Sequence, residues 1–335
     1  MTYNEIVQQF KSGNPKALYL LQGEEAFYIE KLVDLAADCI IPKDFRDFNQ
    51  TILYARDTKP DLLLDTMLRL PIMAERQLVI LKEAQVWNKN SMWEPFEPYF
   101  ERPASTTVFI IAHPHKKFDK RVRTYKLISK IGGTFESETV KDYKLAEWIG
   151  SHVKQKGRKI TDKGVQLIAE CVGNDLGRLD NELEKLNILV AKGEQITEQH
   201  IEKHIGISKD YNAFELGRAV LEGDVLKANK IIQYFSHNPK AGPMVLVLAS
   251  LTNTYRNLFK AHFLKSGDPA ELARISGLHP FVAREFINHK AKHPPRRISR
   301  NFSLLRRYDL MSKGYGSPAV DDSELMKELV FQLLH

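Results

Sequence analysis

The stretch that decides the fold is residues 67–84, with the sequence MLRLPIMAERQLVILKEA. A helix-like apolar run stops at Pro71, because proline lacks an N–H and disfavours helical geometry in the residue before it. Ile72 and Met73 follow this break directly. The run LVIL at residues 78–81 is typical of a strand buried on both faces of a parallel sheet. The stretch therefore predicts a helix, an apolar break and a core strand in close succession.

Working outward, the first 140 residues alternate between strand-like and helix-like patterns. Alternating strands and helices indicate right-handed βαβ units and a parallel sheet of about five strands covered on both faces. The expected strands are residues 17–22, 48–53, 78–81 and 107–112 and a short one at Phe135. The expected helices are residues 26–40, one from Pro60, 91–100 and 121–131.

The turn after the first strand is a possible phosphate site, since a helix N-terminus there can bind an anion. It contains Gly23 but then Glu24 and Glu25, whose carboxylates would repel phosphate, and the G-x-x-x-x-G-K-[ST] pattern is absent. The strand at residues 108–111 ends in Ala112, His113 and Pro114, where a nucleotide site would need acidic residues. We therefore expect no nucleotide, no other cofactor and no catalysis.

From about Val140 the pattern is helical only. Thr161 and Thr197 are suitable N-caps, and Leu176, Leu179 and Leu183 fall on one helical face. Further helices are predicted at residues 214–221, 225–235, 243–263, 269–275, 280–290, 302–313 and 323–334.

Composition sets broader limits. The chain has 335 residues, 43% of them hydrophobic, and a net charge of +7. It has no run long enough for a membrane span and no signal-like N-terminus, so we expect a cytoplasmic protein without membrane partners. Cys39 and Cys171 are expected to be buried thiols. The pairs His200/His204 and His289/His293 lack a third ligand, so no metal site is predicted.

Two basic clusters stand out. The first has interleaved aromatic residues, which suits phosphate binding, but a solvated face is an equally simple interpretation. Its cations are Lys116, Lys117, Lys120, Arg121, Arg123 and Lys126. The second cluster is open to the same two interpretations and contains Arg296, Arg297, Arg300, Arg306 and Arg307.

Four motifs in order carry a family resemblance over essentially the whole chain. They are the strand-GEE-helix opening at residues 17–40, LPIMAERQLVIL at residues 70–81, LDNELEKL at residues 179–186, and a C-terminal pair, GLHPF at 277–281 with DLMSKG at 309–314. Together they resemble the delta subunits of the bacterial DNA polymerase III clamp loader.

The resemblance implies an AAA+-like α/β domain with an inactive ATPase site at residues 1–140. A small three-helix lid domain at 141–208 and an all-α collar domain at 209–335 would follow. It implies no catalysis by this chain, so that a nucleotidyltransferase class would apply only to the polymerase holoenzyme. The implied partners are the sliding clamp (beta), the ATP-hydrolysing subunits (gamma/tau), the delta-prime subunit and primed DNA held by the complex.

Ile72 and Met73 stand where the family places an apolar pair that enters a pocket of the clamp, although many members have a Leu-Phe-like pair there. We expect Leu68, Arg69 and Arg76 to widen this contact. The alternative is that Ile72 and Met73 cap the internal core. Lys116, Lys117, Lys120, Arg121 and Arg123 are candidates for contact with DNA or a partner.

Two functions remain open at this point. The first is a non-catalytic subunit that binds and opens the sliding clamp for loading during replication. The second is a basic nucleic-acid-binding or remodelling protein with a degenerate ATPase fold, which would use residues 116–126.

Overall fold

The computed structural model describes residues 1–335 apart from 207, 209, 265–266, 279 and 316–320. The chain forms two compact units, Met1–Thr139 and Val140–His335. The predicted division into 1–140, 141–208 and 209–335 stays a prediction, and its last boundary falls on a residue outside the described ones. His279 of the predicted GLHPF motif also lies outside them.

The first unit is built on a five-stranded parallel sheet with the order β2-β3-β4-β1-β5. This confirms the predicted α/β class with a five-stranded parallel sheet. β1, β3 and β4 are almost wholly buried, as their continuous apolar runs require. The strands are β1 (Leu18–Gly23), β2 (Gln50–Tyr54), β3 (Gln77–Lys82), β4 (Thr107–Pro114) and β5 (Gly133–Ser137).

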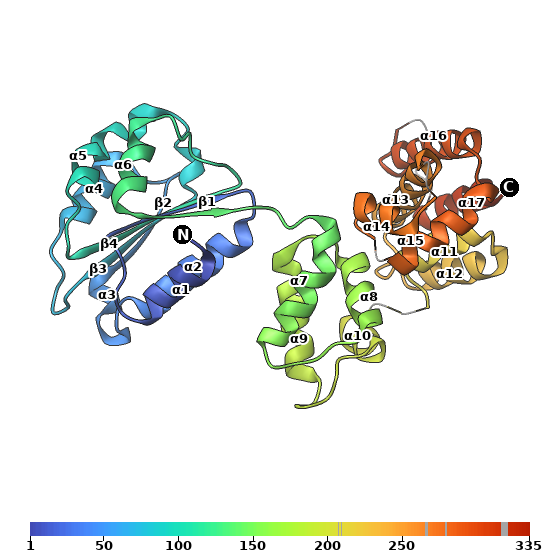
Figure 1. The fold of residues 1–335 in the computed structure, drawn as a ribbon, viewed down its shortest axis with the longest axis horizontal. Helices are drawn as coiled ribbons and strands as arrows, with labels where there is room; N and C mark the ends of the chain where they lie inside the picture. Colours follow the sequence, from blue (N-terminus) through green and yellow to red (C-terminus); the bar gives the residue numbers. More distant parts are fainter. Residues whose placement is uncertain (207, 209, 265–266, 279, 316–320) are drawn as a thin grey trace. The chain divides into compact units, whose positions relative to one another are not determined.

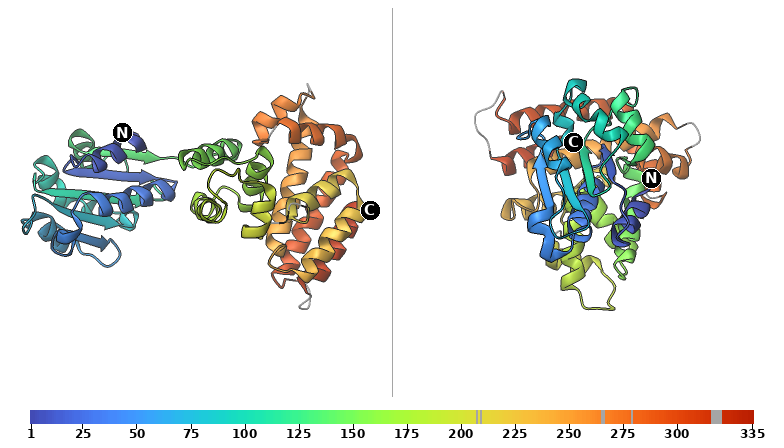
Figure 2. Two further views of the ribbon diagram at one scale, coloured as in Figure 1. Left: turned by 90° about the horizontal axis from the view of Figure 1, so that it is seen from below. Right: turned by 90° about the vertical axis from the view of Figure 1, so that its left-hand side faces the viewer.

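Helices cover both faces of the sheet (Figures 1 and 2). Alternate residues of each strand enter opposite cores: Leu78 and Ile80 join the core beneath α1 and α2, while Val79 and Leu81 join the core beneath α4, α5 and α6. The helices are α1 (Tyr3–Lys11), α2 (Ala26–Cys39), α3 (Arg46–Asn49), α4 (Pro60–Leu68), α5 (Glu97–Glu101) and α6 (Arg123–Ile131).

The continuous helix predicted at residues 91–100 is wrong. The structure has 3-10 turns at Asn90–Met92 and Glu94–Phe96 and only then the short α5. Pro95 and Pro98 explain the break, since each lacks a backbone donor and disfavours helical geometry in the residue before it. Trp93, Phe96 and Phe100 are nevertheless buried, which accounts for the apolar pattern.

The regular elements of the second unit are helices in the described residues, as predicted, apart from one isolated β-bridge between Ile160 and Ile196. Thr161 caps α8 and accepts a hydrogen bond from the N–H of Gly164 at 3.0 Å. The helices are α7 (Asp142–Gln155), α8 (Asp162–Val172), α9 (Leu176–Leu189), α10 (Glu198–Ile205), α11 (Ala213–Glu222), α12 (Val225–His237), α13 (Met244–Phe263), α14 (Pro269–Ser276), α15 (Pro280–His289), α16 (Pro295–Ser312) and α17 (Asp322–Leu334).

Helices α11–α17 enclose one large hydrophobic core of their own. α16 begins at Pro295, seven residues or about two turns before the predicted start at Phe302. Pro295 occupies a first-turn position, where proline is tolerated because its missing N–H would have had no helical partner. Pro294 and Pro295, which were predicted only to separate two helices, therefore stand at the start of α16.

Two further expectations can be compared with the structure. Cys39 is exposed and Cys171 is half-buried, so the prediction of two buried thiols is wrong. Cys39 is the last residue of α2. Among the helices that the structure describes, none is long and apolar enough to cross a membrane.

Gly23, at the end of β1, is required by close packing. Its φ of 131° lies in the region that favours glycine, and a Cβ placed on it would lie 2.0 Å from the carbonyl oxygen of Ser137. The next residue, Glu24, donates its backbone N–H to that same oxygen at 3.0 Å. Gly23 thus allows the ends of β1 and β5 to meet, independently of any phosphate.

We predict that Gly23→Ala lowers the free energy of unfolding of the first unit by about 3 kcal/mol or more, because strain and a backbone clash add together. Gly13→Ala is the matched control: Gly13 also has positive φ (71°) but nothing within 4 Å of its absent Cβ. Its cost should be about 1 kcal/mol. Urea unfolding followed by the fluorescence of buried Trp87 and Trp93 measures both, and equal costs would contradict the packing role.

Candidate functional site

The loop that follows α4 exposes apolar side chains. Leu68 is 58% exposed, Leu70 78%, Ile72 55% and Met73 84%. These values contradict the alternative that Ile72 and Met73 cap the internal core. We refer to Leu68, the last residue of α4, and the loop residues 69–73 together as the display loop. Leu70 was absent from the predicted site residues, although its position between the helix end and Pro71 suggested it.

The backbone turns away from helical geometry before Pro71. α4 ends at Leu68, and Arg69 is already extended, with φ −64° and ψ 150°. The last carbonyls of a helix have no partner within the helix, so those of α4 need other donors if they are buried.

Gln77 supplies such a donor. It is the first residue of β3 and is only 6% exposed. Its Nε2 lies 2.6 Å from the carbonyl oxygen of Arg69 and 3.2 Å from those of both Thr66 and Met67. The hydroxyl of Thr107 on β4 donates to the Met67 carbonyl at 2.9 Å. Two neighbouring strands therefore bind the end of α4.

Asn49 holds the other end of the display loop. It is 2% exposed and is the last residue of α3. Its Oδ1 accepts the backbone N–H of Ile72 at 2.7 Å, while its Nδ2 donates to the Ile72 carbonyl at 2.8 Å and to the Phe45 carbonyl at 3.0 Å. Every polar hydrogen of this amide is used, so the backbone of Ile72 is fixed from both sides.

Met73 has a φ of 54°, in the left-handed region that non-glycine residues rarely adopt. Such a conformation costs of order 1 kcal/mol or more and persists only where the surroundings impose it. The hydrogen bonds at Ile72 impose it here. The most exposed apolar side chain of the loop thus starts from a fixed backbone.

The two predicted flanking arginines differ. Arg69 is exposed in the display loop, whereas Arg76 is half-buried and donates from its guanidinium to the carbonyl of Pro15 at 3.3 Å. Arg69 is therefore available to a partner. Arg76 already contributes to the packing of the first unit.

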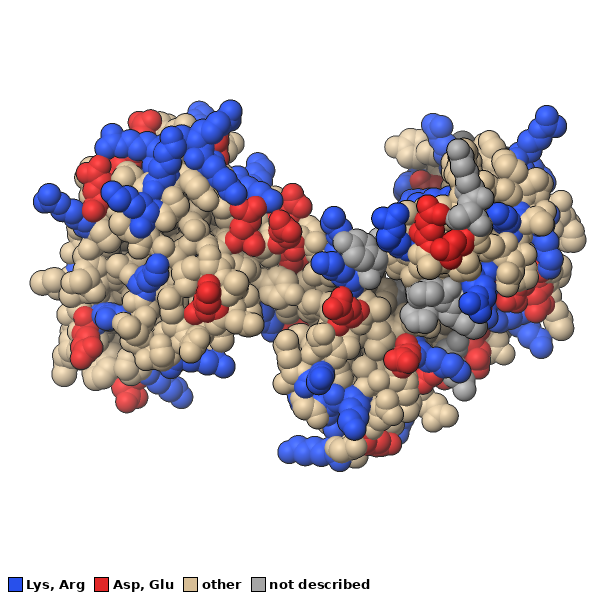
Figure 3. Space-filling view, in the orientation of Figure 1, with Lys and Arg blue, Asp and Glu red and all other residues tan. Residues whose placement is uncertain are grey.

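The basic run at residues 116–126 is largely neutralised by carboxylates. Lys117 and Lys120 contact Glu136 at 2.7 and 2.9 Å, and the paired charges hold the pKa of that carboxyl below its usual value. Arg121 pairs with Asp119 at 2.8 Å and lowers its pKa to about 2. Figure 3 shows acidic groups beside the Lys and Arg side chains over this part of the first unit.

Arg123 pairs with Glu101 at 2.8 Å and with Glu97 at 3.3 Å. Of the five predicted contact residues, Lys116 alone has no ion pair among the described residues. Asp119 lies within the run, but the other three carboxylates, Glu97, Glu101 and Glu136, come from α5 and β5, so the run itself gave no sign of them.

The position that binds phosphate in a nucleotide site is occupied by the protein itself. The carboxylate of Glu25 accepts the N–H of Phe27 at 3.1 Å, and the N–H of Gly23 donates to the carbonyl of Lys116 at 3.1 Å. At the end of β4, His113 is buried, and burial lowers its pKa. A neutral imidazole therefore stands where a metal-binding carboxylate would be needed.

Comparison with known proteins shows what this chain is similar to. Residues 19–139 match the family model described as DNA polymerase III, delta subunit. The DNA polymerase III subunit delta of Bacillus subtilis (strain 168) is 22% identical over 287 residues, covering 83% of this chain and 82% of that protein.

The solved structure of the Bacillus subtilis DNA clamp loader delta protein matches with a TM-score of 0.64 and 19% identity, covering 99% of each chain. The RuvB Holliday junction branch migration motor of Thermotoga maritima gives a TM-score of 0.39 and 14% identity over 66% of this chain and 75% of that one. The matches to delta subunits confirm the resemblance that the motifs indicate.

Proposed function

We propose that this chain is the non-catalytic clamp-loader subunit that binds the sliding clamp (beta) and opens it for loading onto primed DNA during chromosomal replication. The similarity to delta subunits supports a role in the clamp loader. The observation that carries clamp binding is the display loop, whose apolar side chains are exposed while its backbone is held by buried amides.

Energetics favour this use of the loop. Burying a side chain of this size in a partner contributes roughly 1.5–3 kcal/mol, so Ile72 and Met73 together anchor a complex. Leu70 and Leu68 add apolar area beside them, and Arg69 adds a charged rim. Apolar anchors at the centre with charge at the edge are typical of protein interfaces.

The proposed assembly includes the ATP-hydrolysing subunits (gamma/tau) and the delta-prime subunit, with primed DNA reached through the complex. The helical bundle α11–α17 supports a role in assembly, because large apolar side chains remain exposed on it. Examples are Leu226, Val245, Phe263 and Phe331. We place this complex in the cytoplasm, at the nucleoid.

The alternative of a nucleic-acid-binding protein that uses residues 116–126 has less support. Four of the five candidate cations there are paired with Glu97, Glu101, Asp119 or Glu136. A phosphate would have to displace those carboxylates.

Replacing both Ile72 and Met73 by alanine should weaken binding to purified sliding clamp by about 100-fold, because it removes most of the apolar area of the anchor. A pull-down and a titration by surface plasmon resonance would measure the effect. The change removes exposed side chains only, so the unfolding free energy should stay within about 0.5 kcal/mol of wild type.

Ile188→Ala with Leu189→Ala is the control for this experiment, since both residues are exposed apolar side chains at the end of α9. That variant should bind the clamp as wild type does. Undiminished binding by the Ile72/Met73 variant would contradict the assigned site, and absence of binding by wild type would contradict the proposed function.

Asn49→Ala should weaken clamp binding by about tenfold although it leaves every display-loop side chain in place, because the Ile72 backbone loses both of its hydrogen bonds to Asn49. Trypsin should also cleave faster after Arg69. Gln50→Ala is a close control, since the buried amide oxygen of Gln50 has no hydrogen-bond partner among the described residues. Wild-type cleavage and binding by the Asn49 variant would show that the loop does not depend on this amide.

We expect no ATP turnover by the chain alone, since Glu25 occupies the helix terminus that a phosphate would need. Phosphate release should match the background without protein. Lys31, whose Nζ lies 5.5 Å from the centre of the Phe27 ring, is the lysine nearest in sequence to this turn. Hydrolysis that disappears on Lys31→Ala would overturn the assignment of an inactive site.

A further inference from the structure

The positive charge of the chain is concentrated in one segment. Residues 284–313 contain nine Lys or Arg and two Asp or Glu, which gives +7. The whole chain has 49 Lys or Arg and 42 Asp or Glu, which is also +7. The other 305 residues are therefore neutral in sum. The nine cations are Arg284, Lys290, Lys292, Arg296, Arg297, Arg300, Arg306, Arg307 and Lys313.

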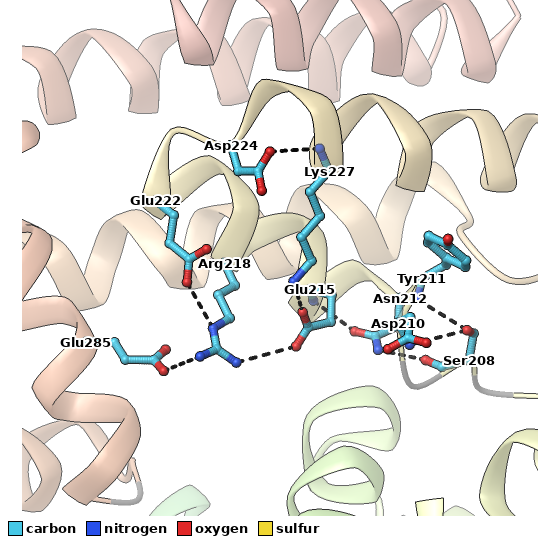
Figure 4. A network of polar contacts seen from close by, with 10 residues as sticks. All are labelled: Ser208, Asp210, Tyr211, Asn212, Glu215, Arg218, Glu222, Asp224, Lys227 and Glu285. Carbon is cyan, nitrogen blue, oxygen red and sulfur yellow. Dashed lines mark hydrogen bonds and ion pairs between the residues drawn. The ribbon is translucent and has the colours of Figure 1, made fainter. Parts of the chain in front are cut away.

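The two acidic residues of this segment do not offset the charge of its arginines. Glu285 on α15 is bound by Arg218 of α11, which also contacts Glu222 at 3.2 Å (Figure 4). Asp309 pairs with Lys313, one turn further along α16, at 2.7 Å. Among the residues that the structure describes, the arginines of α16 therefore have no carboxylate partners.

α16 has two distinct faces. Ile298, Asn301, Leu305 and Tyr308 are buried against the bundle. Every exposed residue from position 296 to position 307 is an arginine or a serine, namely Arg296, Ser299, Arg300, Ser303, Arg306 and Arg307. Arg296, Arg300 and Arg307 lie within about 40° of one another on the side of the helix away from the buried face and form a row that spans about 16 Å along the helix axis. We call these three residues the arginine row.

Arg297 has a different role. It is half-buried, and its guanidinium donates to the carbonyls of Leu333 and Leu334 at 3.1 and 2.7 Å. It therefore caps the C-terminus of α17. The arginine row makes no ion pair or side-chain hydrogen bond among the described residues.

We propose that the arginine row on α16 binds the sugar–phosphate backbone of DNA without reading its sequence. Arginine forms bidentate hydrogen bonds with phosphate. The hydroxyl of Ser299, between Arg296 and Arg300, is a further donor for a phosphate oxygen, whereas that of Ser303 already donates to the Ser299 carbonyl at 3.2 Å. A protein partner would need apolar anchors at the centre of its interface, and this stretch of α16 exposes none. The site lies outside the display loop, and its test involves no clamp, so it and the proposed function can fail separately.

The test compares the full-length chain with a triple variant, Arg296→Gln, Arg300→Gln and Arg307→Gln. Fluorescence anisotropy would follow a labelled single strand, a duplex and a primed junction at several salt concentrations. At about 50 mM salt the triple variant should bind at least about tenfold more weakly, and its slope of log K against log salt should be smaller by about 2 to 3. Comparison of the three DNA forms identifies the preferred one.

The matched control removes three charges elsewhere, with Lys11→Gln, Lys43→Gln and Lys130→Gln, all exposed residues of the first unit outside the basic run at residues 116–126. DNA binding by this variant should stay within about threefold of wild type, and circular dichroism should confirm that both variants fold. An equal loss in both variants would show a general charge effect and overturn the proposal. Absence of DNA binding by wild type, or unchanged binding by the arginine variant, would also overturn it.

Discussion

The side-chain amide of Gln77 joins a helix end to the sheet, and the geometry of the whole site depends on that contact. The carbonyls that end α4 are buried and have no donors within the helix. Gln77 reaches them from the first position of β3, with Thr107 of β4 beside it. A buried carbonyl left without a donor costs about 1–3 kcal/mol, so this arrangement fixes where α4 stops and where the display loop begins.

Much of the fold could be predicted because a strand that is buried on both faces of a sheet appears in the sequence as a continuous apolar run. The continuous apolar runs of β3 and β4 were placed within one or two residues. The errors in the predicted helix bounds occur at prolines, because a proline can either interrupt a helix or occupy its first turn. Pro95 and Pro98 break an apolar segment that was expected to be helical, whereas Pro295 starts a helix that was expected to begin a turn or more later.

The site was less predictable, because its supports come from distant parts of the chain. Pro71 and the apolar residues after it pointed to the display loop, but Asn49 lies 23 residues before Ile72, and no local pattern links them. The two basic clusters looked equivalent in sequence. They differ because Glu97, Glu101 and Glu136 fold against the first cluster, while none of the carboxylates in the described part of the chain pairs with the arginine row.

The magnitudes explain why a loop of this kind has to be held before its partner arrives. Ordering the backbone of one residue costs about 1–2 kcal/mol, so ordering the five residues from Arg69 to Met73 on binding would cost about 5–10 kcal/mol. Burying Ile72 and Met73 returns only about 3–6 kcal/mol. A flexible loop with the same side chains would therefore gain nothing from docking. Because Asn49 and Gln77 hold the loop in the folded protein, its backbone is already ordered before binding. The ordering cost is met when the chain folds, and apolar burial in the cores on both faces of the sheet offsets it. The apolar gain of the loop is then available for binding the proposed partner.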